Sequence, residues 1–193
     1  MTTSPKPNRW LRRTSSALVL VLLAVFAIEP VTGRAASREY DLKAAFLYNF
    51  ATFGEWPQSA FASASSPFVI GVLGPDPFGS ALEEIVVGER IKGRPIVIRR
   101  FERPEQALQG CQILFVSAAE KRHLREILSV VRDRPILTVA DLPGFVESGG
   151  LIGFTTSARI GIQVNPVALR AANLNISPKL LRLAEVVAVN SPP

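Results

Sequence analysis

The chain has 193 residues, a formal net charge of +6 and a single cysteine. This length is sufficient for one domain with a hydrophobic core. Most of the charge belongs to the first 35 residues, so the remainder carries 17 basic and 15 acidic side chains. That remainder is too weakly basic for the nucleic-acid-binding class, and one cysteine excludes an internal disulfide.

The first 35 residues have the three parts of a secretory signal peptide. Lys6 to Arg13 form a positive region, Ala17–Ile28 an apolar core, and Gly33-Arg34-Ala35 a cleavage site with small residues. The apolar core is shorter than the ~20 residues that a membrane-spanning helix needs. We therefore expect cleavage after Ala35, or after Ala36 as the runner-up, and no direct membrane insertion of the mature protein. An uncleaved N-terminal anchor is the alternative.

Residues 40–57 predict one apolar helix that ends before Pro57, with Asp41 as its N-cap. Apolar side chains such as Leu42, Phe46 and Phe50 recur at spacings of three and four, which is the period of a helix face. A helix this apolar is not stable when it faces water on all sides. We expect later strands to cover it, with a protein contact along one edge as the alternative.

The following segment alternates apolar strands with helices. The spacing predicts strands over 67–73, 95–100, 111–116 and 135–140, and helices over 76–87, 104–109 and 117–131. Asp76-Pro77 is expected to cap the first helix, Gly88 to end it, and Ser117 with Glu120 to form a capping box. This alternation indicates an α/β fold whose mostly parallel sheet is flanked by helices.

The pattern changes after Gly149-Gly150. Strands over 151–154 and 159–164 are expected to form a C-terminal β-hairpin on one edge of the sheet, followed by two helices. Asn165-Pro166 would cap the first of these, to about Asn173, and Ser177-Pro178 the second, to about Val187. The organisation is therefore a signal peptide over 1–35, a single domain over 38–188 and a frayed tail over 189–193.

The residues that carry chemistry are scarce. His123 and Cys111 are the only histidine and the only cysteine of the sequence. A zinc site, a Ser/His/Asp triad or a Cys/His catalytic pair therefore has almost no candidate residues. We expect no catalytic residues, no metal, no cofactor and no enzymatic activity. Cys111 lies in a predicted buried strand and is expected to be inert, with an intermolecular disulfide as the alternative.

One loop lies where α/β folds bind ligands. It runs from Gly74 through Asp76 to Gly79, between a strand and a helix, and Asp141 follows the fourth strand. These four residues define the alternative function, a small-molecule binding module. In the competing interpretation, these residues only form a turn and cap a helix.

A second stretch suggests a protein contact. Between the two C-terminal helices, apolar and polar side chains meet in a turn that we expect to be exposed, which is typical of a docking site. The candidate partner-binding residues are Gln163, on the polar face of the preceding strand, and Arg170, Leu174, Asn175 and Ile176 in the following segment. In the alternative, Leu174 and Ile176 are tucked under the helices.

Several motifs together resemble the YfiR family of bacterial periplasmic proteins. They are DLKAAFLYNFATFGEWP, VLGPDPFG, GCQILFVS, ILTVADLPGF with GGLIGF, and QVNPVALRAANLNISPKLLRLAEVV. They follow one another in order over essentially the whole mature domain. The resemblance implies an exported, non-enzymatic repressor that binds the periplasmic sensor domain of an inner-membrane diguanylate cyclase. Binding would lower cyclic-di-GMP and biofilm formation.

The resemblance also implies a homodimer and a link to envelope redox state through disulfides. Cys111 in GCQILFVS matches the family in this respect. The partner cysteine expected in the strand PFVIGVLG is absent, and the segment 144–150 has Val146 where a cysteine is expected. Disulfide-based redox sensing is therefore in doubt for this chain.

Overall fold

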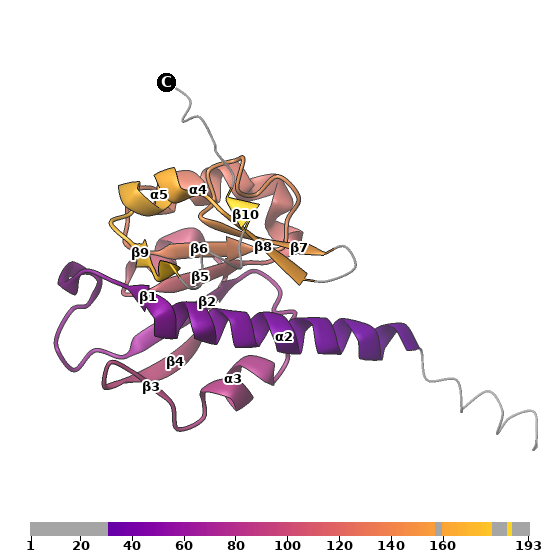
Figure 1. Cartoon of the computed structure of the whole chain (residues 1–193), viewed down its shortest axis with the longest axis horizontal. Helices are drawn as coiled ribbons and strands as arrows, with labels where there is room; N and C mark the ends of the chain where they lie inside the picture. Colours follow the sequence, from indigo (N-terminus) through magenta and orange to yellow (C-terminus); the bar gives the residue numbers. More distant parts are fainter. Residues whose placement is uncertain (1–30, 157–159, 179–184, 187–193) are drawn as a thin grey trace, which may run out of the picture. The chain divides into compact units, whose positions relative to one another are not determined.

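The computed structural model describes residues 31–156, 160–178 and 185–186. The chain divides into two compact units, Met1–Ala36 and Ser37–Pro193, and the second holds all of the described strands (Figure 1). Residues 1–30 of the predicted signal peptide and the predicted tail over 189–193 lie outside the described residues.

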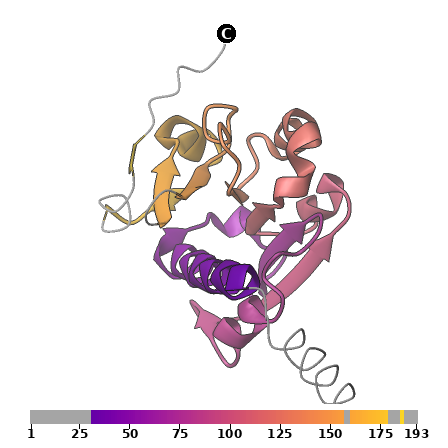
Figure 2. The same cartoon turned by 90° about the vertical axis from the view of Figure 1, so that its right-hand side faces the viewer.

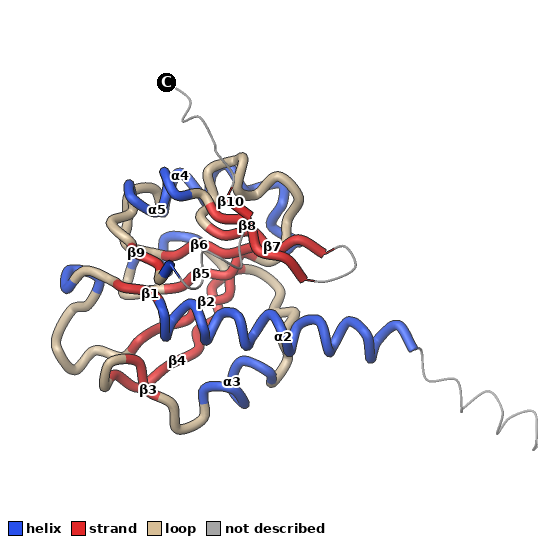
Figure 3. The backbone as a smooth tube through the Cα atoms, viewed as in Figure 1, coloured by secondary structure: helices blue, strands red, loops and turns tan. Residues whose placement is uncertain are grey.

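Strands and short helices alternate along the second unit (Figure 3). The helical elements are α2 Val31–Phe53, η1 Gln58–Ala60, α3 Ala81–Val86, η2 Pro104–Leu108, η3 Ala118–His123, α4 Leu124–Val131 and α5 Pro166–Ala171. The strands are β1 Gly54–Glu55, β2 Phe68–Leu73, β3 Arg90–Ile91, β4 Arg94–Phe101, β5 Ile113–Val116, β6 Leu137–Ala140, β7 Ile152–Thr156, β8 Ile160–Val164, β9 Asn175–Ile176 and β10 Glu185–Val186.

The described strands form one large sheet and one small ribbon. The large sheet has the order β10-β8-β7-β6-β5-β2-β4-β3, and the ribbon pairs β1 with β9 antiparallel. In the large sheet only the β7–β8 and β4–β3 pairs are antiparallel. Strands β2, β5 and β6 are buried along their whole length, as expected where both faces of a parallel sheet are covered. The predicted mixed α/β fold with a mostly parallel sheet is confirmed.

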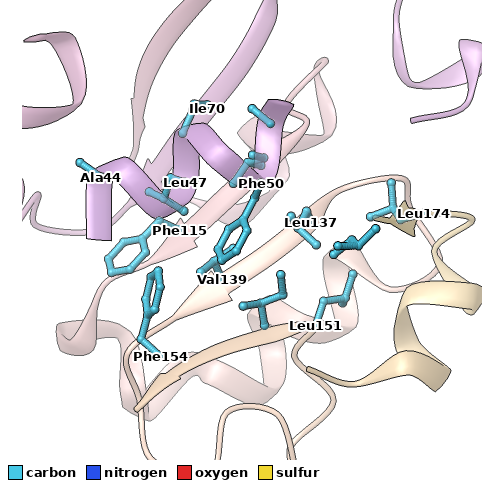
Figure 4. Packing of buried hydrophobic residues seen from close by; sticks show 14 of the residues in the cluster. Ala44, Leu47, Phe50, Ile70, Phe115, Leu137, Val139, Leu151, Phe154 and Leu174 are labelled. Carbon is cyan, nitrogen blue, oxygen red and sulfur yellow. The ribbon is translucent and has the colours of Figure 1, made fainter. Parts of the chain in front are cut away.

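From Ser37 to Phe53, helix α2 lies within the curve of the sheet (Figure 2). Figure 2 shows it nearly end-on, with the magenta strands on one side and the orange strands on the other. Leu47 and Phe50 of α2 are fully buried, and the Phe50 ring stacks on Phe154 of β7 at 6.1 Å between centroids (Figure 4). The prediction that later strands cover this helix is confirmed. Leu42 and Phe53 on its outer side remain about half exposed.

The opposite face of the sheet carries a second hydrophobic cluster. Helix α4 contributes Ile127, Leu128 and Val131, and the segment after β6 contributes Leu142 and Phe145. The sheet is therefore covered on both sides, which explains why its central strands read as continuous apolar runs rather than as alternating ones.

Several predicted helix starts are wrong. Asp41 lies inside α2, which begins at Val31, and α2 ends at Phe53 because the chain then enters β1. Asp76 caps only a turn, accepting a hydrogen bond from Phe78 N at 2.7 Å, while α3 starts at Ala81. Ser117 makes no side-chain cap bond, and the helix it precedes begins as the 3₁₀ segment η3. Local cap chemistry is also compatible with turns, so it did not locate these starts.

The C-terminal part differs from the prediction at the edge of the sheet. Asn165 does cap α5, since its Oδ1 accepts from Val167 N and Ala168 N at 3.1 and 2.9 Å. Strands β7 and β8 pair antiparallel, but β10 pairs parallel to β8, so the β7–β8 pair does not form the edge. Glu185–Val186 is a strand where a helix was predicted, and most of that predicted helix, residues 179–184, lies outside the described residues.

Candidate functional site

A surface hollow forms where the β1–β9 ribbon joins the segment after α2 to the segment after α5. The ribbon pairs Gly54 with Ile176 and Glu55 with Asn175, and Asn175 Nδ2 donates to Glu55 Oε2 at 3.1 Å. The hollow has a volume of about 450 Å³ and is lined by Glu55, Trp56, Pro57, Arg170, Asn173, Leu174 and Asn175. It therefore brings three of the predicted partner-binding residues next to four residues that the sequence did not single out for binding.

Trp56 is the aromatic wall of this hollow, and two contacts fix it. Its Nε1 donates to the backbone oxygen of Gln112 at 3.1 Å, and its ring packs edge-on against Phe68 at 4.9 Å between centroids. The buried Gln112 side chain accepts from Val69 N and donates to Ala60 O, both at 2.7 Å. The segment after α2 is thus tied to strands β2 and β5, so Trp56 presents a fixed apolar surface.

Leu174 and Ile176 are not exposed, which agrees with the alternative in which they are tucked under the helices and not with an exposed docking turn. Only 7% of Leu174 and 4% of Ile176 is accessible, and both pack in the hydrophobic cluster that includes α2. Arg170 and Asn175 are exposed on the same turn. The apolar side chains of this turn thus hold it on the domain, and the polar ones face outward.

Gln163 lies apart from the hollow. It is partly buried near the C-terminal end of β8, where it pairs in register with Gly153 of β7 and Glu185 of β10. Because it does not line the hollow, the five predicted partner-binding residues do not form one surface.

The predicted ligand loop is bound by an arginine of the protein itself. Arg100 of β4 donates through Nε to Asp76 Oδ2 at 2.8 Å and also pairs with Glu83 of α3. The Arg100 contact lowers the pKa of Glu83 and, in return, raises the pKa of Arg100. Arg100 Nη2 also lies 3.4 Å from the Gly79 oxygen, while Gly74 turns the chain with a φ of 83°. The guanidinium group of Arg100 thus occupies the position beside Asp76 where a cation or hydrogen-bond donor of a ligand would bind.

Asp141, the fourth predicted ligand residue, lies in a buried cluster with residues from the middle of α2. Its Oδ2 accepts from Tyr40 Oη and from Lys43 Nζ, both at 2.7 Å, and Lys43 also pairs with Glu39 at 2.6 Å. Only 1% of the Lys43 side chain and 7% of the Asp141 side chain is accessible. Burial and the hydrogen bond to Asp141 raise the pKa of the Tyr40 hydroxyl well above its usual value. Asp141 and the 74–79 loop both lie at the carboxyl edge of the parallel strands, with Tyr40 packed edge-on against Phe78 of the loop.

Cys111 is buried just before β5, and its Sγ contacts the Ile113 oxygen at 2.9 Å. Burial raises the pKa of the thiol to about 12. Because the thiolate is the reactive form, the folded protein holds this cysteine in an unreactive state.

We expect Cys111 to resist iodoacetamide in the folded protein at pH 8, and to be alkylated fully once guanidinium unfolds the chain. Intact-mass spectrometry of the two samples measures this difference. Rapid alkylation of the folded protein would contradict the burial of the thiol and would reopen a redox role for it.

The remaining residues that could act in catalysis or metal binding do not lie together. His123 is exposed and contacts Glu120 at 3.2 Å, far along the chain from Cys111. Within the described residues, no three His, Cys, Asp or Glu side chains are grouped so that they could hold a metal ion. Across the same residues, we found no helix with the length and apolar character that a membrane crossing requires.

Comparison with known proteins identifies the family. A family model described as YfiR/HmsC-like matches residues 40–185, whereas no curated protein matches the chain. Among solved structures, the chain is similar to a conserved domain protein from Vibrio cholerae O1 biovar El Tor strain N16961, with 10% identity and a TM-score of 0.46. That similarity covers 61% of this chain and 54% of the other, so the chain spans about half of the length of that protein. The match over residues 40–185 includes nearly all of the described strands and helices, and the chain belongs to the YfiR/HmsC-like family.

Proposed function

We propose that this protein is an exported periplasmic regulator that binds the sensor domain of an inner-membrane diguanylate cyclase and represses it. The observation that carries the proposal is the YfiR/HmsC-like match over residues 40–185, because that family suggests periplasmic regulation of cyclic-di-GMP cyclases without catalysis. In this proposal residues 1–35 are a signal peptide that is removed, residues 38–188 are the working domain, residues 189–193 form a tail, and the mature protein is a homodimer.

Repression by binding requires a difference in affinity. The regulator has to bind the inactive form of the cyclase more tightly than the active form, because equal affinity shifts no equilibrium. A hundredfold preference corresponds to about 2.7 kcal/mol, which a few buried side chains at an interface can supply.

The hollow beside the β1–β9 ribbon is the surface that we propose for this contact. It combines an anchored aromatic wall, Trp56, with the exposed polar groups Arg170 and Asn175. Aromatic residues and arginine are enriched where protein interfaces carry most of their binding energy. Figure 1 shows β1 and β9 side by side at one end of the domain.

The experiment that tests the function is a pull-down from solubilised inner membrane with the tagged mature protein as bait. We expect mass spectrometry to recover a diguanylate cyclase with a periplasmic sensor domain, and deletion of the gene to raise cellular cyclic-di-GMP. Unchanged cyclic-di-GMP in the deletion strain, together with no specific membrane partner, would overturn the proposal.

Reversing the charge at Arg170 tests the surface. Because Arg170 is exposed on α5 and lines the hollow, Arg170→Glu is expected to leave the fold intact and to weaken binding of the sensor domain about tenfold or more. Surface plasmon resonance with the immobilised sensor domain measures the change. The matched control is Arg125→Glu, which makes the same charge change at an exposed position on α4, outside the hollow. Equal loss of affinity in both variants would mean that net charge, and not this surface, sets the affinity.

A further inference from the structure

A cavity separates α4 from α5 on a part of the domain that the proposed contact does not use. Its volume is about 330 Å³, within the lower range of small-molecule sites. Its walls are largely aliphatic, with Leu128 and Val131 from α4, Leu151 from the loop before β7, and Ala168 and Ala172 from α5. An apolar ligand body of modest size fits this lining.

Two buried polar side chains hold the walls of the cavity in place. Thr138, a polar residue in the otherwise apolar strand β6, accepts a hydrogen bond from Leu151 N at 3.1 Å through Oγ1. Asn165 is also buried and caps α5 through Val167 N and Ala168 N. Since both side chains line the cavity and bind its walls, the cavity is formed before any ligand arrives.

Two exposed arginines line the mouth of the cavity. Arg132 and Arg134 flank Asp133, which has a φ of 57° in the turn after α4. In the described part of the chain, neither guanidinium group has a hydrogen bond or an ion pair. Arg94, by contrast, donates to two loop carbonyls and packs on Phe61.

The acids at the mouth limit the charge of the ligand. Asp133 and Glu147 also line the cavity, so a second negative charge on a ligand would meet a carboxylate. A single carboxylate directed toward the arginines gains a bidentate hydrogen-bond partner and meets less repulsion than a dicarboxylate would.

From these features we propose that the α4–α5 cavity binds a small monocarboxylate with an aliphatic body. The carboxylate lies against Arg132 and Arg134, and the aliphatic body lies between α4 and α5. This site is distinct from the predicted ligand loop at 74–79, and it does not depend on the proposed cyclase partner.

Octanoate is the probe for this site. We expect saturable chemical-shift changes in the ¹⁵N-labelled protein, confined to residues 128–138, 147–151 and 165–172. Neutral octanamide and the dianion suberate are expected to bind about tenfold or more weakly than octanoate. Shifts that map to another part of the protein, no saturation up to the solubility limit, or equal binding of octanamide would each overturn the proposal.

The variant Arg132→Ala/Arg134→Ala removes the carboxylate partners and leaves the apolar walls intact. It is expected to bind octanoate about tenfold or more weakly, with its octanamide affinity unchanged. The matched control is Lys121→Ala/Arg125→Ala, because both residues are exposed near the start of α4 and do not line this cavity. Equal losses in the two double variants would also overturn the proposal, since general attraction of an anion would then explain the binding.

Discussion

Replacing Lys43 by alanine is expected to lower the free energy of unfolding by about 3–5 kcal/mol, because it removes one partner of a buried ion pair. Lys43 Nζ is the cation next to Asp141, whose other oxygen, Oδ1, is buried and has no hydrogen-bond partner among the described residues. Without Lys43, the carboxylate of Asp141 keeps only the Tyr40 hydroxyl as a partner. Urea unfolding of the purified protein, followed by circular dichroism, measures the loss.

The double variant Lys43→Met/Asp141→Leu is the control for this prediction. It removes both charges together, and replacement of a whole buried pair by apolar residues of similar size is often close to neutral. The double variant is therefore expected to be more stable than Lys43→Ala. If Lys43→Ala loses less than about 1 kcal/mol, a value typical of exposed ion pairs, the pair is solvated and the description of this cluster is wrong.

Leu174→Asp is expected to lower the free energy of unfolding by about 4 kcal/mol or more, a large part of the roughly 5–15 kcal/mol of a typical domain. The leucine side chain lies in the same hydrophobic cluster as α2, so an aspartate there would place an unpaired charge in an apolar surrounding. This is the reverse of what the sequence predicts for an exposed docking residue, namely a variant that folds and binds weakly. Thermal unfolding measured by circular dichroism distinguishes the two outcomes.

Asn175→Asp is the matched control, since it introduces the same side chain one residue away at an exposed position. It is expected to fold with a midpoint close to that of the parent protein, with a small loss from repulsion between the new carboxylate and Glu55. A folded Leu174→Asp variant with an unchanged midpoint would show that Leu174 is not part of the core.

The central strands could be predicted because the sequence features that indicate them are local. Strands β2, β4, β5 and β6 come from runs of β-branched and apolar residues that are bounded by glycine and proline. Each strand differs from its predicted range by at most two residues at either end. The short strands β1, β3, β9 and β10 have two residues each, too few to give any periodicity. Their pairing depends on tertiary contacts, which a single sequence does not display.

The candidate site was predicted in part for the same reason. The segment 170–175 attracted attention because it mixes apolar and polar residues in a turn, and it does line the hollow. The contribution of Glu55 and Trp56 could not be predicted, because only the pairing of β1 with β9 brings them there. Likewise, nothing local indicated that Lys43 and Asp141, far apart in sequence, would form one buried pair.

The β1–β9 ribbon also determines when the hollow proposed for partner binding can form. It joins residues 54–55 to residues 175–176, so the two walls of the hollow are connected by a very long loop of chain. Contacts of such large sequence separation cost loop-closure entropy and form late during folding. A nascent or proteolytically shortened chain that lacks residues 170–176 would have the Trp56 wall alone. The hollow is therefore complete only when residues 55–57 and 170–175 have come together, so the contact proposed for it requires the folded domain.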